Sequence, residues 1–343
     1  MRAALFRQHG GPEVMEVAEL PDPVPGPGQV LVRVRAAALN HLDIWVRRGI
    51  PALKVAFPHI LGGDACGVVA GLGPGATGVK EGDRVVINPG ITCGRCARCL
   101  SGQDNLCPQF KMVGEHTWGA EAELVAVPAV NVALAPAGPS DAELASLPIA
   151  TMTAWQMLLE KARMQRHETV LVMAAGSGVG VAAIQIAKLH GAHVIAASSS
   201  DDKLARAREL GADEVVRYGE GVDLAAELKK MTGKRGVDVI IESLGGPLFP
   251  ALIRSLAQGG RLVTCGNTAG HEANIDLRYV FWRQLSILGS TMAPKSALLA
   301  ILRLVGEGRL KAIVDRVLPL DQVVEAHRAL EARAVFGKVV LSV

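Results

Sequence analysis

The sequence predicts an α/β protein of two domains, one rich in β-strands and the other a doubly wound parallel sheet. Three observations lead to this fold class. The chain has 343 residues, more than one hydrophobic core usually accommodates. Short apolar runs separated by turns fill residues 1–140. Strand and helix patterns then alternate as far as residue 289, which is typical of a parallel sheet with crossover helices.

The amino-terminal part has the pattern of strands joined by tight turns. Valines alternate with arginines through residues 29–36, the period-two pattern of a half-buried strand. Apolar runs at 68–70 and 84–87 predict two further short strands. The Gly- and Pro-rich joints at 21–28 and 71–78 predict turns, because they are too short to divide domains. We therefore expect a compact β-rich domain here.

The alternating part begins at a helix start signal. Ser140 is followed three residues later by Glu143, a capping box ahead of an apolar helix at 147–159. Beyond it, the pattern predicts strands at 169–173, 193–197, 214–216, 238–241 and 261–264, with helices at 179–190 and 201–210. After residue 289 it predicts a helix rich in Leu and Ile, a helix at 321–333 and a last strand at 338–341.

Charge and hydropathy exclude several classes of function. The 36 basic and 33 acidic side chains are interspersed, and the net charge is only +3, so no nucleic-acid footprint is visible. Charged residues interrupt every apolar run well short of the roughly 18 residues that a membrane helix needs. Residues 1–5 lack the apolar core of a signal peptide. We expect a cytoplasmic protein with neither membrane nor nucleic-acid partners.

A glycine-rich turn lies between the strand at 169–173 and the helix at 179–190. Its small residues would let the backbone approach a pyrophosphate, and the helix that follows offers free N–H groups and a positive dipole end. A turn with only a packing role is the alternative, but the surrounding strand–turn–helix context favours an NAD(P)-binding Rossmann domain. The candidate contacts are Gly176, Ser177, Gly178, Val179 and Gly180, with Thr153 from the preceding helix.

The end of the next strand indicates the choice of nucleotide. A carboxylate there would bind the ribose 2′-hydroxyl of NAD, but three serines stand at 198–200. Two aspartates at 201–202 could repel a 2′-phosphate, although their simpler role is to favour a helix N-terminus. We expect NADP, with NAD possible. The residues that suit a 2′-phosphate or the adenine are Ser198, Ser199, Lys203 and Tyr218.

Four of the six cysteines cluster within 15 residues in a pattern that suits a metal better than disulfides. Four thiolates complete the tetrahedral shell of zinc and leave no position for water or substrate. We therefore expect one structural zinc, held by Cys93, Cys96, Cys99 and Cys107. The other two cysteines, Cys66 and Cys265, are expected to be small buried hydrophobes. His327 lies at helical spacing from Val323 and Leu330, which favours core packing over metal ligation.

In combination, these features resemble the medium-chain dehydrogenase/reductase superfamily along essentially the whole chain. The landmarks in family order are Gly82-Asp83-Arg84-Val85, the cysteine lobe, Gly119-Ala120-Glu121-Ala122-Glu123, the dinucleotide loop and Gly236-Val237-Asp238-Val239. The resemblance implies a GroES-like catalytic domain from residues 1–140 and 290–343, with the zinc lobe at 93–107. It further implies a Rossmann domain at 141–289. We expect a homodimer or homotetramer.

The catalytic zinc of the alcohol dehydrogenase branch has no matching ligands here. The resemblance aligns its three ligands with Asn40, Gly63 and Ile149, and Leu42 replaces the threonine of the proton relay. Asp64, alone or with a nearby histidine, could not make the open three-ligand site that activates an alcohol.

The runs Asn40-His41-Leu42-Asp43 and Gly62-Gly63-Asp64 are instead similar to those of the quinone oxidoreductase branch. The resemblance therefore implies hydride transfer from NAD(P)H to a quinone, enone or activated carbonyl without catalytic zinc. Asn40 would donate a hydrogen bond to the developing charge. Asp43 and Asp64 would organise the pocket as acceptors, or serve only as ion pairs and turn caps. Two alternatives stay open: an alcohol dehydrogenase with an atypical metal site, and a nonenzymatic NADPH-binding protein.

Overall fold

The structure is a computed structural model that describes residues 1–343. It divides into two compact units, Met1–Met152 with Met292–Val343, and Thr153–Thr291. Helix α3 (Asp141–Ala145) belongs to the first unit because it packs on strands β3 and β5 of that unit. The division between the units therefore falls after Met152 and not at the expected residue 140.

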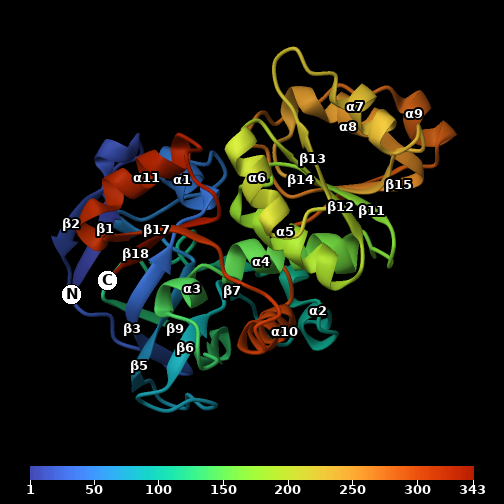
Figure 1. Cartoon of the computed structure of the whole chain (residues 1–343). Coiled ribbons are helices and arrows are strands. Elements are labelled where there is room, and N and C mark those ends of the chain that lie inside the picture. Colours follow the sequence, from blue (N-terminus) through green and yellow to red (C-terminus); the bar gives the residue numbers. More distant parts are fainter. The chain divides into compact units, whose positions relative to one another are not determined.

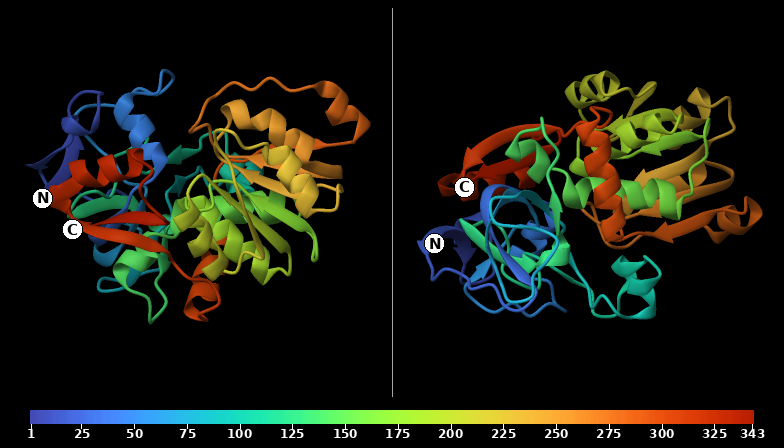
Figure 2. Two further views of the ribbon diagram at one scale, coloured as in Figure 1. Left: turned by 45° about the horizontal axis from the view of Figure 1, so that its top comes forward. Right: turned by 90° about the horizontal axis from the view of Figure 1, so that it is seen from below.

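The first unit is built mainly of β-strands. Its seven-stranded sheet has the order β10-β6-β5-β3-β18-β17, with β9 also paired to β3. Figure 2 shows the red carboxyl-terminal strands of this sheet within the same unit as the blue amino-terminal ones. The bounds are β3 (Gln29–Ala38), β5 (Asp64–Leu72), β6 (Arg84–Ile87), β9 (Leu124–Pro128), β10 (Val132–Leu134), β17 (Val314–Pro319) and β18 (Lys338–Ser342). Two smaller sheets join β1 (Arg2–Phe6) to β2 (Glu16–Glu19) and β4 (His59–Ile60), and β7 (Gly90–Ile91) to β8 (Lys111–Met112).

The helices of the first unit and of its junction with the second range from four to twelve residues. The capping box predicted at Ser140 is confirmed, since the Ser140 hydroxyl accepts from the Glu143 backbone N–H at 3.2 Å and the Glu143 carboxylate accepts from the Ser140 N–H at 2.8 Å. The single helix expected at 147–159 is instead α4 (Pro148–Trp155) followed by a π-helical turn at Gln156–Lys161. The remaining helices are α1 (His41–Arg48), α2 (Ala97–Leu100), α10 (Lys295–Gly306) and α11 (Val323–Glu331).

The second unit confirms the doubly wound parallel sheet. Its six strands have the order β13-β12-β11-β14-β15-β16, and all neighbours are parallel. Figure 1 shows α5 and α6 on one face of this sheet and α7 and α8 on the other. The strands are β11 (Thr169–Val172), β12 (His193–Ser198), β13 (Glu214–Arg217), β14 (Val237–Glu242), β15 (Leu256–Thr264) and β16 (Ser286–Gly289). The helices are α5 (Gly178–Leu189), α6 (Asp201–Glu209), α7 (Leu224–Met231), α8 (Phe249–Ser255) and α9 (Leu277–Trp282).

Each unit buries its own apolar core. In β3, Val30, Val32 and Val34 are buried while Arg33 and Arg35 are exposed, as their alternation predicts. The central strands of the parallel sheet are buried on both faces, as expected for strands covered by helices on each side. No helix has both the length and the apolarity needed to cross a membrane.

Candidate active site and metal centre

Strand register brings three polar residues together in the first unit. Strand β3 lies between β5 and β18, and its residue Ala38 pairs with Asp64 on one side and with Val340 on the other. Continuing the antiparallel register past the end of β3 places Asn40 opposite Lys338. Asp64 and Lys338, at the starts of their strands, therefore flank Asn40.

A closed hydrogen-bond triangle joins these three side chains. The Lys338 ammonium donates to Asn40 Oδ1 at 2.6 Å and to Asp64 Oδ2 at 3.0 Å. Asn40 Nδ2 donates to Asp64 Oδ2 at 2.9 Å, with a longer contact of 3.4 Å to the Ala38 carbonyl. The other Asp64 oxygen accepts from the Ile149 backbone N–H at 2.8 Å. Because Asp64 is fully buried, these bonds compensate the loss of water around its carboxylate.

Asp43 fixes the backbone around this triangle. Its carboxylate accepts from the Asn40 backbone N–H at 2.6 Å and from the Gly62 N–H at 3.1 Å, so Asn40 and Asp43 form a capping box at the start of α1. Burial, followed by the nearby Glu121, raises the pKa of Asp43 to about 7, against the two backbone hydrogen bonds that lower it. The Asp43 carboxylate thus holds the backbone of the loop, and its hydrogen bonds go to no side chain of the triangle.

A second buried polar cluster adjoins Asp43. Glu121 is fully buried, neither of its carboxylate oxygens has a hydrogen-bond partner, and one lies 4.0 Å from His327 Nε2, which is also unpartnered. On its other side, the His327 ring is 2.7 Å from the Arg47 guanidinium, which pairs with Glu331. Burial raises the pKa of Glu121 to about 8, and burial followed by Arg47 lowers the pKa of His327 to about 4. His327 lies in the core, as predicted.

The residues around the triangle do not fit a catalytic zinc. Gly63 and Ile149 offer no ligand atom, and a Cβ added at Gly63 would lie 2.9 Å from the Ile149 δ-carbon, so the Ile149 side chain fills this space. The His59 ring bonds to a backbone carbonyl at 3.0 Å. Burial lowers the pKa of His41 to about 4, with smaller effects from nearby cations. Outside the four-cysteine cluster, no three His, Cys, Asp or Glu side chains gather as ligands.

The four predicted cysteines do form a metal centre. The sulfur atoms of Cys93, Cys96, Cys99 and Cys107 all lie within 4.8 Å of one another, and the hydrogen-bonding pairs among them are 3.5–3.9 Å apart. Zn–S bonds of about 2.3 Å in a tetrahedron require sulfur separations of about 3.8 Å. Backbone N–H groups lower the pKa of Cys93 to about 6, whereas burial raises the pKa of Cys99 to about 11, so the sulfur geometry carries the assignment. The quartet is a structural zinc site.

The predicted dinucleotide loop joins β11 to α5 in the second unit. Ser177 caps α5 by accepting from the Gly180 N–H at 3.0 Å. A Cβ added at Gly180 would lie 2.4 Å from the Ala174 carbonyl oxygen, so only glycine permits this close turn, and Ala174 itself has a φ of 49°. The helix leaves its first N–H groups without helical partners, so the loop residues fit a bound pyrophosphate. Thr153, the remaining candidate, is buried in α4.

The serines at the end of β12 have an arginine beside them that sequence reasoning missed. Ser198 is buried, and its hydroxyl accepts from the Ser200 N–H at 3.2 Å, while Ser199 is exposed. In the parallel register, Ser198 pairs with Arg217 at the end of β13. Arg217 forms an exposed ion pair with Asp201 at 2.8 Å, so the aspartate that could repel a 2′-phosphate already has a cationic partner. Its neighbour Tyr218 donates its backbone N–H to the Ser198 carbonyl, and Lys203 lies half-buried in α6.

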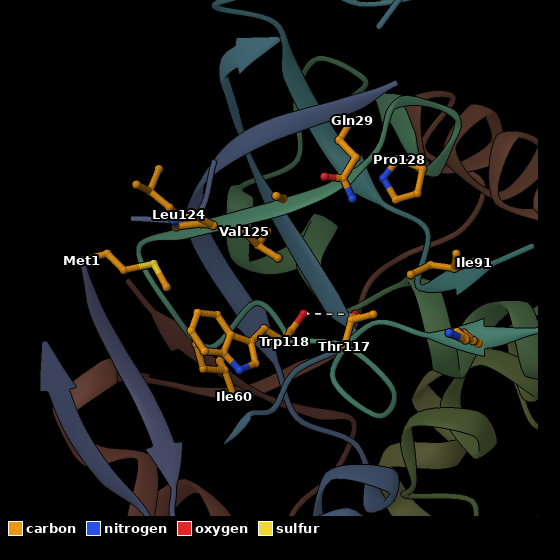
Figure 3. A pocket seen from close by; sticks show the side chains of 13 residues that line it. Met1, Gln29, Ile60, Ile91, Thr117, Trp118, Leu124, Val125 and Pro128 are labelled. Atoms are coloured by element: carbon orange, nitrogen blue, oxygen red, sulfur yellow. Dashed lines mark hydrogen bonds between the residues drawn. The ribbon is translucent and has the colours of Figure 1, made fainter. Parts of the chain in front are cut away.

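A surface pocket lies elsewhere in the first unit. Its volume is about 380 Å³, and Figure 3 shows Trp118 beside Ile60 among its mainly apolar lining. The Trp118 ring nitrogen is bonded to the Pro58 carbonyl at 3.0 Å. None of the candidate catalytic residues lines this pocket.

Two family models match the chain. The alcohol dehydrogenase GroES-like domain matches residues 26–137, and the zinc-binding dehydrogenase family matches residues 178–307. A crystal structure of an NAD-dependent alcohol dehydrogenase has 54% sequence identity and a TM-score of 0.97 over 100% of both chains. The chain belongs to the zinc-containing medium-chain dehydrogenase/reductase family. It is therefore an NAD(P)-dependent oxidoreductase of the alcohol dehydrogenase superfamily, as the sequence predicts.

Other members of the family differ in what their names say they act on. An NAD-dependent alcohol dehydrogenase of Sulfolobus acidocaldarius is 33% identical over 353 residues, covering 100% of both sequences. An acryloyl-coenzyme A reductase of Metallosphaera sedula is 29% identical over 344 residues, again covering 100% of both. The family thus gives the class of reaction and leaves the substrate of this medium-chain dehydrogenase/reductase open.

Sequence reasoning missed several residues of the site. Lys338 stands at the start of an otherwise apolar strand, where a lone lysine before Val-Val-Leu is the only signal. Glu121 belongs to a family landmark in the sequence, but nothing in that run indicates that its carboxylate is buried without a partner. Arg47 and Arg217 carry no local motif, since their partners are distant in sequence or belong to the preceding element.

Proposed function

We propose that this dehydrogenase/reductase catalyses hydride transfer from NAD(P)H to a quinone, enone or activated carbonyl, without a catalytic zinc. The observation that carries the proposal is the absence of zinc ligands at Asn40, Gly63 and Ile149, the three positions that match the zinc ligands of alcohol dehydrogenases. Ionising a simple alcohol at neutral pH is hard without a Lewis acid. Reducing an already electrophilic carbon needs mainly positioning and modest charge stabilisation.

The chain's own residues supply that stabilisation in this proposal. NAD(P)H, held through Gly176–Gly180, supplies the hydride when bound. One N–H of the Asn40 amide makes only a long contact, of 3.4 Å, with the Ala38 carbonyl. In this proposal it donates instead to the substrate oxygen, where negative charge develops. Asp64 anchors the other N–H of the same amide, and Asp43 holds the Asn40 backbone. These contacts orient the amide before substrate binds, which lowers the cost of organising the site during the reaction.

The acryloyl-coenzyme A reductase relative supports an activated alkene as the substrate. An acryloyl thioester contains a carbon–carbon double bond conjugated with a carbonyl, the same electrophile as an enone. Hydride addition to such a substrate would oxidise NAD(P)H to NAD(P)+ and move an electron pair onto the carbonyl oxygen, giving an enolate. A proton taken up from water would then complete the reduction. A site that offers hydrogen-bond donors to that oxygen is suited to this chemistry.

We further propose that NADPH is preferred over NADH. Ser198 stands where an NAD-specific site usually holds a carboxylate. Arg217, beside it in the sheet, has an exposed ion pair that contributes little stability and can be exchanged for a phosphate contact. Lys203 adds a second nearby cation. The names of the NAD-dependent relatives favour the opposite preference. The affinities for NADPH and NADH, measured side by side, decide between the two.

An alcohol dehydrogenase with an atypical metal site is the second candidate. The names of the 54% identical structure and of the Sulfolobus acidocaldarius relative favour it over the first. The geometry around Asn40 favours the zinc-independent reductase, because the donor set for a second metal is missing.

A homodimer or homotetramer also remains a proposal. Strand β16 forms one edge of the parallel sheet and carries Ile287, which is 38% exposed. Helix α9, just before it, exposes Phe281 and Trp282. Exposed aromatic groups beside an open sheet edge are typical of protein–protein contacts.

A substrate panel assayed with both nucleotides tests the proposed function. The panel should contain a quinone, an α,β-unsaturated ketone, an acyl-coenzyme A thioester with a conjugated double bond, and ethanol in the oxidative direction. We expect reduction of at least one electrophilic substrate and poor oxidation of ethanol. Rapid ethanol oxidation with no turnover of the electrophiles would favour the second candidate. Nucleotide binding without turnover of any compound in the panel would contradict both candidates.

A further inference from the structure

The site around Asn40 contains one positive charge, and it comes from the other end of the chain. Lys338 is the only cationic side chain that hydrogen-bonds to Asn40 or Asp64. Gly337, just before it, has a φ of 95°, and a Cβ there would lie 2.2 Å from the Ile313 carbonyl oxygen. This glycine turn fixes where β18 begins. The register of β18 with β3 then places the Lys338 ammonium at the end of β3, next to Asn40.

The triangle has hydrogen-bond donors left over. An ammonium has three N–H groups, and Lys338 uses two of them, on Asn40 and Asp64. Asp64 accepts only and Lys338 donates only, so together they fix which end of the Asn40 amide faces each partner. The amide nitrogen, directed at Asp64, keeps one N–H with only a long contact to a carbonyl. Both unfilled positions are donors, and they suit an oxygen atom that carries negative charge.

The same contacts disfavour a divalent ion. The two side-chain oxygens that such an ion would need here are Asn40 Oδ1 and Asp64 Oδ2. The Lys338 ammonium already lies within 3.0 Å of both. Two cations in one buried site repel strongly, because few water molecules screen them. Lys338 is only 5% exposed, so bulk water screens its positive charge weakly.

We infer that Lys338 provides, in place of a metal ion, the positive charge that stabilises the substrate oxygen during hydride transfer. The third N–H of its ammonium donates to that oxygen beside the Asn40 amide, and its charge also neutralises Asp64. An unpaired Asp64 carboxylate would oppose charge development on the substrate. This inference rests on the proposed function, since it names the group that acts on the substrate of that same site.

The test compares the kcat of three variants on whichever electrophilic substrate the wild type reduces fastest. Lys338→Met removes the charge, Lys338→Arg keeps it, and Lys338→Met combined with Asp64→Asn removes both charges so that no buried carboxylate is left unpaired. We expect kcat to fall about 10²-fold or more in Lys338→Met, by analogy with losing an oxyanion donor. The neutral double variant should fold normally and still be at least about 10-fold slower than wild type. Lys338→Arg should retain more activity than either.

Two controls separate a chemical role from a structural one. Lys295→Met removes a lysine that is bonded to Asp104 at 3.1 Å in the same unit, and its kcat should stay within about twofold of wild type. Methylammonium added to Lys338→Ala should restore part of kcat, whereas tetramethylammonium, which has no N–H, should not. Nucleotide affinity should be unchanged in all variants.

The outcomes distinguish this inference from the proposed function. If the wild type reduces an electrophile but the neutral double variant has the same kcat, the inference about Lys338 is wrong and the proposed function stands. The same conclusion follows if folded Lys338→Ala is inactive and methylammonium does not restore it. A second zinc in the active wild type would overturn both.

Discussion

Lys338 Nζ lies 3.0 Å from Asp64 Oδ2, although 274 residues separate the two in sequence. The contact exists because β18 and β5 flank the same strand, β3, at the end where Asn40 begins helix α1. It places a paired charge beside Asn40, the residue proposed to contact the substrate.

Asn40→Ala should lower kcat by about 10²-fold, because it removes the proposed hydrogen-bond donor to the developing charge. Nucleotide affinity and zinc content should hardly change, since both sites lie elsewhere in the chain. Steady-state kinetics on the best electrophilic substrate measures the effect. Asn274→Ala, at an exposed position, serves as the control. A wild-type kcat in Asn40→Ala would remove Asn40 from the proposed mechanism.

Cys96→Ser should release the structural zinc and reduce thermal stability, because structural zinc binding contributes directly to the free energy of folding. Elemental analysis should find close to no zinc in the variant. Cys66→Ser, which changes a buried cysteine outside the quartet, should retain it. Full zinc content in Cys96→Ser would show that the ligand assignment is wrong.

Fluorescence titration of the wild type should give a lower Kd for NADPH than for NADH. Ser198→Asp should shift the preference toward NADH, because a carboxylate accepts from the ribose diol and repels a 2′-phosphate. A tenfold or larger change in the ratio of the two Kd values is expected, corresponding to about 1.4 kcal/mol. Ser296→Asp, which adds the same charge at an exposed position of α10, should leave the ratio unchanged. Tighter binding of NADH by the wild type would contradict the proposal.

Glu121→Gln should change how stability depends on pH. The pKa of Glu121 rises from 4.5 in the unfolded chain to about 8 in the folded protein, mainly through burial. Between those values the folded state binds a proton that the unfolded state has released, so this group's contribution to stability falls as pH rises. The variant lacks that loss, and its stability relative to wild type should increase between pH 5 and pH 9 by on the order of a few kcal/mol.

The measurement is the free energy of unfolding of both proteins in denaturant at each pH. The buried His327, whose pKa is lowered to about 4, adds an opposite trend between pH 4 and pH 6.5. Comparing variant with wild type at the same pH removes the part of that trend that the two share. The exposed Glu325→Gln is the matched control and should show no such divergence. Parallel curves for Glu121→Gln and wild type would mean that Glu121 does not titrate as its burial implies.

Local patterns predicted the fold and the parts of the site that lie within one segment. The valine alternation in 29–36, the turn at 174–180 and the cysteine quartet each carry their signal within a few residues, and the structure contains all three elements. Helices α7 and α8 and the edge strand β16 were not predicted, because each is only four to eight residues long and gives a short pattern.

Contacts between distant segments could not be predicted in this way. The prediction of Asn40, Asp43 and Asp64 rests on two short runs that resemble those of a known family, and the register of β3 with β5 brings Asn40 and Asp64 together. The Lys338 contact depends on a second register, that of β3 with β18, which no single segment encodes. The unpartnered Glu121 is likewise visible only once its burial against His327 is known. Charged residues at the ends of otherwise apolar strands are the positions where such contacts are worth looking for.

The zinc content of catalytically active wild-type protein tests the central claim most directly. Zinc per chain should be measured by elemental analysis, before and after dialysis against a chelator, alongside reduction of the best electrophilic substrate. We predict one zinc per chain, bound by the cysteine lobe. We also predict that reductase activity persists as long as this lobe stays folded and that it requires no second metal. Two zincs per chain, with activity lost as the second is removed and regained when it is restored, would contradict the account.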